Sequence, residues 1–237
     1  MSDHQEYNGF STGLTLLGMM VIFGVFLLTQ NLVFLMLSLL AGAESISQIM
    51  GGPHSGDLLM ISSIMAALLG TATVWIFLKF KKLSFGDYLG FKSFKISQLI
   101  IWALIYLAFL VLLYLFRDFF QEEVYFVEEM LRGVNYLPLL YLSVVVGAPL
   151  FEEIFLRGFA YKGLKEGILG AGGAITITAL IFALLHAMQY GPYYLIAIFA
   201  GGLIMGMARH YSGSLWVPII LHGLHNLISI IYIFEPQ

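Results

Sequence analysis

The chain has 237 residues, of which 60% are hydrophobic and only 11% are charged. This composition excludes an ordinary soluble domain, in which about 25% of residues are charged. The net charge of −3 and the lack of a basic patch give no indication of a nucleic-acid partner. The chain contains no cysteine, which excludes disulfides, a thiol nucleophile and a cysteine-based metal site.

Apolar runs of about 20 residues predict an all-α, polytopic membrane protein rather than a β-barrel, whose strands are about 10 residues long. The N-terminus lacks the cationic region of a signal peptide, so we expect the first run to be retained as a span. We predict about seven transmembrane helices, or eight if one helix is missed. The runs are 14–40, 58–80, 99–116, 136–165, 174–188, 193–208 and 214–234.

We divide the chain into an N-terminal transmembrane region, 1–135, and a four-helix catalytic core, 136–237. The first region carries no motif that we can interpret. It ends in an acidic stretch, 117–135, which we expect to be an amphipathic helix at the outer surface, with a solvated loop as the alternative. Lysines between Lys79 and Lys95 place their loop in the cytoplasm by the positive-inside rule. We therefore expect a multi-pass protein of the cell membrane.

Two adjacent acids, Glu152 and Glu153, and the base Arg157 interrupt the fourth run. Ionised groups are costly in hydrocarbon, so such residues are functional candidates by default. Glu153 and Arg157 are four residues apart and share a helical face, so we expect them to form an ion pair. Glu152 lies about 100° around the helix and has no partner on it. Pro149 lacks a backbone donor and predicts a kink or break just before the two acids.

Polar side chains also occur in later runs, namely His186, His222, His225 and Asn226. His222 and Asn226 are four residues apart, so they project from one helical face. Glu152 and His186 are each about 21–23 Å from the intervening turn at 1.5 Å per helical residue. Antiparallel neighbouring helices would bring them to one level. We therefore expect a single shared site.

Such a set of side chains can activate water against a carbonyl carbon. A carboxylate and an imidazole can deprotonate and orient the water, and a second imidazole and an amide can hold the oxyanion. No serine lies in a G-x-S-x-G pattern. A zinc site built from Glu152, His186 and His222 is chemically reasonable, although the H-E-x-x-H signature is missing.

Three motifs occur in order, namely Glu152-Glu153-x-x-x-Arg157, Phe182-x-x-x-His186 and His222-x-x-x-Asn226. Together they resemble the motifs of the CAAX prenyl protease 2 and bacteriocin-processing (CPBP, Abi) family, over roughly 136–232. The resemblance implies a helical intramembrane endopeptidase. It implies that Glu152 and His186 activate water, that His222 and Asn226 form the oxyanion site, and that Glu153 and Arg157 support them. His225 falls outside the motifs, and we expect it to be structural.

The resemblance leaves the cofactor open, since the family has been described both as metal-dependent and as glutamate-dependent. We expect no cofactor, with zinc on Glu152, His186 and His222 as the alternative. The expected substrate is a membrane-embedded or lipidated peptide, and the oligomeric state is undetermined. A proton-coupled transporter would also explain buried charges, although no inverted repeat is visible. A non-catalytic partner of the immunity type is the third hypothesis.

Overall fold

The computed structural model describes residues 9–52, 54–116 and 133–234, and this part of the chain contains helices and no strand. Five stretches in it are long and apolar enough to cross a membrane. Two further apolar helices, α10 and the stretch Trp216–Ile231 of α12, are shorter. The protein is therefore polytopic and all-α, as predicted, while the number of crossings stays a prediction. The five long stretches are α1 (Thr12–Leu40), α3 (Ser55–Phe80), α5 (Ile96–Phe116), the composite helix Leu137–Lys165 and α11 (Pro192–Ser212). The two shorter helices are α10 (Gly170–Leu185) and α12 (Trp216–Phe234).

Two short helices lie in stretches that we expected to be loops. Helix α2 (Ile46–Gly51) follows α1, and helix α4 (Phe85–Leu89) follows α3. A serine caps the N-terminus of each, because the Ser45 and Ser84 hydroxyls accept hydrogen bonds from the first turn. The amphipathic helix predicted over 117–135 falls mostly on residues 117–132, which lie outside the described residues.

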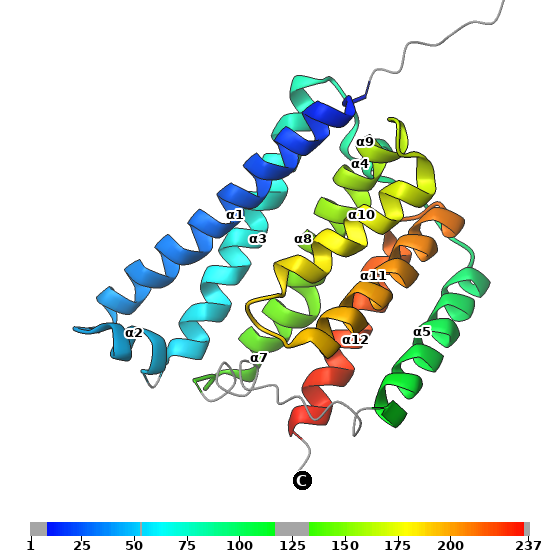
Figure 1. Ribbon diagram of the computed structural model, residues 1–237. Coiled ribbons are helices and arrows are strands. Elements are labelled where there is room, and N and C mark those ends of the chain that lie inside the picture. The colour runs from blue at the N-terminus through cyan, green and yellow to red at the C-terminus, as the bar shows by residue number, and fades with distance from the viewer. Residues whose placement is uncertain (1–8, 53, 117–132, 235–237) are drawn as a thin grey trace, which may run out of the picture.

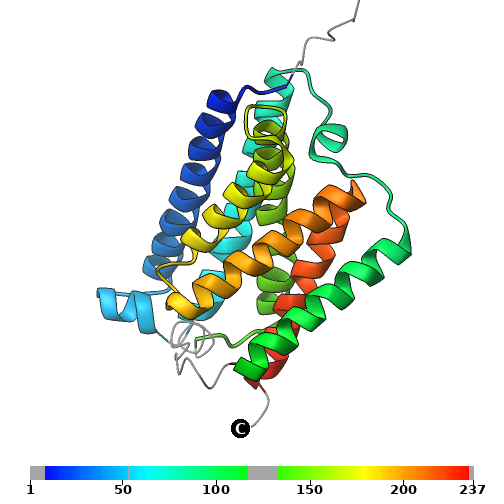
Figure 2. The ribbon, with the colours of Figure 1, turned by 45° about the vertical axis from the view of Figure 1, so that its right-hand side comes forward.

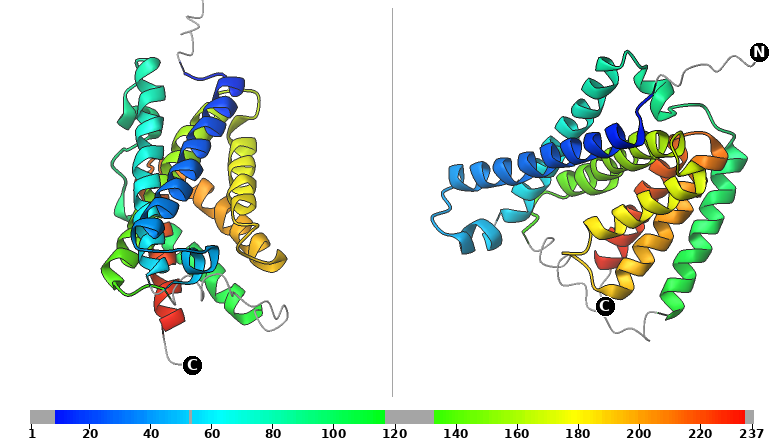
Figure 3. Two further views of the ribbon diagram at one scale, coloured as in Figure 1. Left: turned by 90° about the vertical axis from the view of Figure 1, so that its left-hand side faces the viewer. Right: turned by 45° about the horizontal axis from the view of Figure 1, so that its top comes forward.

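The composite helix Leu137–Lys165, which carries the two glutamates, lies between two groups of helices (Figures 1 and 3). Helices α1 and α3 pack together on one side of it. Helices α10, α11 and α12 lie on the other side, and α5 borders α11 and α12 at the edge of the bundle (Figure 2). This arrangement places the two glutamates opposite the histidines of α10 and α12.

The composite helix is built from five segments in unbroken succession: α7 (Leu137–Leu140), η2 (Tyr141–Gly147), α8 (Ala148–Glu153), η3 (Ile154–Ala160) and α9 (Tyr161–Lys165). The two η segments are π-helical, with wider turns than an α-helix. The helix is therefore not broken before Pro149, while the kink that we predicted as the other possibility stays a prediction. The wide turns of η2 immediately before Pro149 let the helix continue past a residue that has no N–H to donate.

The bundle is held together between α1 and the composite helix by aromatic packing. The rings of Phe26 and Phe151 are stacked, with centroids 4.6 Å apart, and Phe151 stacks in turn on Phe155. Gly70 of α3 lies against the Phe151 ring, where a Cβ would collide with it. Apolar side chains gain little by moving from lipid into a helix interface, because both environments are apolar. Membrane helices therefore associate through close packing at small residues.

The lysines at the ends of α3 and of the composite helix gather at one end of the bundle. The end of α3 with Lys79, helix α4 and helix α9 with Lys162 and Lys165 lie at this end, and α2 and α7 lie at the opposite end (Figure 1). The lysines that we assigned to the cytoplasm are thus on one side of the fold. The orientation in the membrane stays a prediction.

Candidate active site

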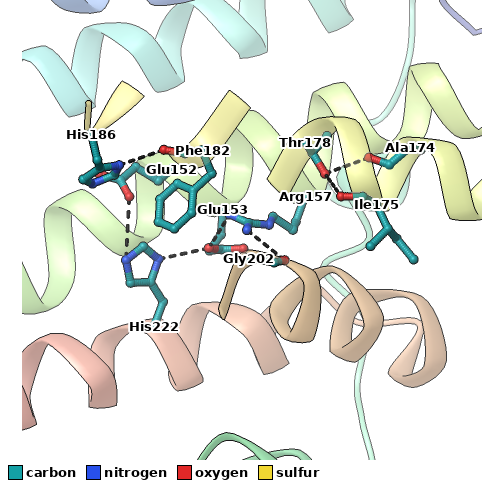
Figure 4. Close-up of polar contacts among 10 residues, drawn as sticks. All are labelled: Glu152, Glu153, Arg157, Ala174, Ile175, Thr178, Phe182, His186, Gly202 and His222. Carbon is teal, nitrogen blue, oxygen red and sulfur yellow. Dashed lines mark hydrogen bonds and ion pairs between the residues drawn. The ribbon is translucent and has the colours of Figure 1, made fainter. Parts of the chain in front are cut away.

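An ion pair between Glu153 and Arg157 forms the buried base of the site. Arg157 Nη1 donates to Glu153 Oε1 at 3.0 Å, and both side chains are fully buried. Arg157 Nη2 donates to the backbone carbonyl of Gly202 in α11 at 3.2 Å (Figure 4). A Cβ at Gly202 would lie 3.2 Å from Arg157 Nη2 and 3.1 Å from Ala179, so glycine allows this close approach. The pair predicted from the spacing therefore also joins two helices.

His222 connects the two glutamates. Its Nδ1 lies 3.0 Å from Glu153 Oε1, and because a carboxylate only accepts, Nδ1–H is the donor. On the other side of the ring, Nε2 lies 3.6 Å from Glu152 Oε2 (Figure 4). The Glu152 side chain is 26% exposed, whereas that of Glu153 is 0% exposed. The two adjacent acids thus occupy opposite environments, and Glu152 is directed toward His222.

His186 caps the C-terminus of α10 and is oriented by its own helix. Its Nδ1–H donates to the Phe182 carbonyl at 2.8 Å, so in the neutral ring Nε2 is the free acceptor. The Phe182 ring contacts both histidines edge-on, with centroids 4.8 Å from His186 and 5.5 Å from His222. The Arg157 guanidinium lies 4.7 Å from the same ring. Phe182 therefore packs against both histidines and against Arg157.

The two remaining polar residues of α12 face different neighbours. Asn226 Nδ2 donates to the Val144 carbonyl of η2 at 2.7 Å. His225 packs edge-on against the Tyr106 ring of α5 at 5.7 Å, and its Nδ1 has no hydrogen-bond partner among the described residues. Asn226 therefore points toward the composite helix and His225 toward α5, in keeping with a packing role for His225.

Comparison with known proteins finds a similar family for this part of the chain. Residues 133–228 match the family described as type II CAAX prenyl endopeptidase Rce1-like. The chain is therefore similar to this family over these residues, which are less than half of its length. The Rce1-like region, as we call residues 133–228, contains all six site residues that the motifs predict.

Two bacterial relatives are similar to the chain. The membrane-embedded CAAX protease MroQ of Staphylococcus aureus (strain USA300) is 31% identical over 111 residues, which are 44% of this chain and 43% of MroQ. An uncharacterized 24.3 kDa protein of Escherichia coli is 30% identical over 96 residues, 38% of this chain and 42% of that protein. The chain thus matches less than half of the length of each relative. No solved structure matches the chain.

The structure brings together side chains that are far apart in the Rce1-like region. Glu152 and Glu153 come from α8, His186 from the end of α10 and His222 from α12, and all four lie around the Phe182 ring (Figure 4). Asn226 lies one helical turn beyond His222 on the same face of α12. The structure therefore gathers these side chains around one ring, while the single shared site that we predicted from helix lengths stays a prediction. Their chemical roles stay predictions.

Two of the three side chains named in the zinc alternative lie close together. Glu152 Oε2 and His222 Nε2, at 3.6 Å, are close enough to be two ligands of one ion. A catalytic zinc needs three protein ligands. Among the described residues, no three histidine, aspartate or glutamate side chains are grouped so that they could hold a metal ion. The choice between zinc on Glu152, His186 and His222 and no cofactor stays a prediction.

The motifs did not indicate Tyr190, which lies beside the site. Its ring centroid is 6.0 Å from that of His186, and its backbone N–H donates to the His186 carbonyl. Burial and, to a smaller extent, the Glu152 carboxylate raise the pKa of the Tyr190 phenol. The spacing Phe182, His186, Tyr190 is four residues at each step and could have indicated one shared face.

Proposed function

We propose that this protein is an intramembrane endopeptidase that hydrolyses a peptide bond with water activated by Glu152 and His186. The observation that carries the proposal is the different surroundings of the two adjacent acids. Glu153 is fully buried and bound by Arg157 and His222, while Glu152 is partly exposed next to a histidine. A catalytic base must reach its substrate, whereas a supporting residue need not.

The reaction uses the carboxylate of Glu152 and the Nε2 atom of His186. Glu152 takes a proton from a water while the water oxygen attacks the carbonyl carbon, and the free Nε2 of His186 accepts the second water hydrogen as a hydrogen bond. The resulting tetrahedral intermediate carries its negative charge on the former carbonyl oxygen. Transfer of the proton from Glu152 to the amide nitrogen then breaks the C–N bond, leaving a new carboxyl terminus and a free amine.

His222 and Asn226 are proposed to stabilise the oxyanion. Since Nδ1–H of His222 is donated to Glu153, only the doubly protonated ring can also donate from Nε2. Asn226 uses one amide hydrogen for the Val144 carbonyl and keeps a second one. A preorganised donor of this kind contributes typically 10²–10³ in rate. Glu153 and Arg157 support this arrangement by holding the His222 ring.

The substrate class is proposed from the family and from the membrane location. A membrane-embedded or lipidated peptide reaches a site inside a helical bundle by lateral diffusion in the lipid. Purified protein in liposomes should cleave members of a library of membrane peptides, each present with and without a lipid group on the same sequence. Mass spectrometry would identify the new termini. If no peptide is cleaved beyond the level seen with Glu152→Gln, the proposal fails.

We also propose that the reaction needs no metal. If Glu152 were a zinc ligand, no second acid would be available as the base, because Glu153 is held by Arg157 and His222. We expect purified active protein to contain less than one zinc per chain and to keep its activity after treatment with a membrane-permeant chelator. Elemental analysis and the peptide assay measure this. One zinc per active chain, with activity lost on its removal and restored on its return, would contradict it.

A further inference from the structure

The carbonyl that binds Asn226 lies in an unusual part of the composite helix. In η2 the backbone bonds run from residue i+5 to residue i, and the N–H of Ala148 donates to the Ser143 carbonyl in this register. The next bond of the series would run from residue 149 to Val144. Residue 149 is proline, which has no N–H. The helix donor that would serve the Val144 carbonyl is therefore missing.

Helix α12 supplies the missing donor. Asn226 Nδ2 lies 2.7 Å from the Val144 oxygen, and since a carbonyl only accepts, the amide nitrogen must face it. The two helices approach closely here, because a Cβ at Gly223, one turn before Asn226, would lie 2.9 Å from the Val145 oxygen. This contact determines which end of the Asn226 amide faces η2, and it leaves one amide hydrogen and Oδ1 directed elsewhere.

We propose that Pro149 is a positioning residue for Asn226. By offering no N–H, Pro149 leaves the Val144 carbonyl free to bind Asn226, and this bond holds the amide in the orientation that the oxyanion role needs. The structural half of the proposal, Pro149 to Val144 to Asn226, stands on hydrogen bonding alone. The catalytic half rests on the proposed function.

The test is a double-mutant cycle between Pro149→Ala and Asn226→Ala. Alanine at 149 adds an N–H that can donate to Val144 within the helix, so the Val144 carbonyl no longer depends on Asn226. Asn226→Ala should lower the unfolding temperature when Pro149 is present, because it leaves the partly buried Val144 carbonyl without a donor. In the Pro149→Ala background, Asn226→Ala should lower the unfolding temperature much less. Such coupling is expected for residues that share one hydrogen-bond network.

The same variants give a kinetic readout. Asn226→Ala should lower kcat by roughly 10²–10³ with KM nearly unchanged, the loss typical of one oxyanion donor. Pro149→Ala should lower kcat in the same way, and the double variant should be no slower than Asn226→Ala alone. Asn226→Leu, which keeps a similar size but cannot donate, should behave like Asn226→Ala in both backgrounds and serves if the alanine variants fold poorly.

Pro138→Ala is the matched control. Pro138 lies in the first turn of the same composite helix, where an N–H has no helix partner in any case. The losses in unfolding temperature from Pro138→Ala and from Asn226→Ala should be additive in the double variant. Equal losses in unfolding temperature from Asn226→Ala with and without Pro149 would overturn the proposal, since the new N–H would then serve Val145 or no carbonyl. Thermal coupling without any cleavage by the wild type would keep the positioning role and reject the proteolytic function.

Discussion

Glu152→Gln is expected to abolish peptide hydrolysis while leaving the protein folded. Glutamine keeps the size and most hydrogen bonding of the side chain but cannot take a proton from water. The loss of a general base typically lowers the rate by about 10²–10⁴. Because Glu152 is partly exposed and makes no short hydrogen bond in the described structure, the unfolding temperature should change little. Cleavage of a substrate peptide and thermal unfolding in detergent measure the two effects.

Glu166→Gln is the matched control for this prediction. Glu166 belongs to the same composite helix region, and its ion pair with Lys162 at 2.7 Å is about one-third exposed on both sides. It lies outside the site, so the same chemical change there should leave hydrolysis unchanged. Equal activity of wild type and Glu152→Gln would contradict the role of Glu152 and, with it, the proteolytic function.

Removing one member of the buried pair should instead unfold the protein more easily. Glu153→Gln or Arg157→Met leaves the other charge in a dry environment, and breaking a buried pair in this way typically costs about 3–5 kcal/mol. Arg157→Met also removes the bond to the Gly202 carbonyl, whereas Glu153→Gln leaves that bond in place. We expect a large fall in unfolding temperature for each single variant, measured in detergent or lipid nanodiscs.

The double variant Glu153→Gln/Arg157→Met should recover part of this loss, because no unpaired charge remains. As a comparison, Lys162→Met should have a small effect, since partly exposed ion pairs contribute about 0–1 kcal/mol. If Glu153→Gln were as stable as Glu152→Gln, the two acids would not differ in the way that their burial indicates.

Much of this protein could be predicted from its sequence because the determining interactions are local. A run of about 20 apolar residues must become a helix in lipid, where every backbone group needs a partner within its own segment. The pairing of Glu153 with Arg157 follows from spacing on one helix and holds whatever surrounds it. The placement of lysines at one end of the bundle follows from span length and order along the chain.

The contacts between helices were decided only by the tertiary structure. The sequences of apolar helices such as α5 and α10 carry hydrophobic side chains on all faces, so the sequence does not determine how each helix is rotated or which neighbour it meets. For this reason the bonds from His222 to Glu153, from Arg157 to Gly202 and from Asn226 to Val144 could not be predicted.

Pro149 shows where local and tertiary effects meet. Its missing N–H is evident from the sequence and predicted a kinked or broken helix. The structure keeps the helix continuous through the wide turns of η2, and α12 brings Asn226 to the carbonyl that the proline leaves free. A missing donor can be recognised from sequence, but the group that replaces it comes from a helix more than 70 residues away and depends on how the two helices pack.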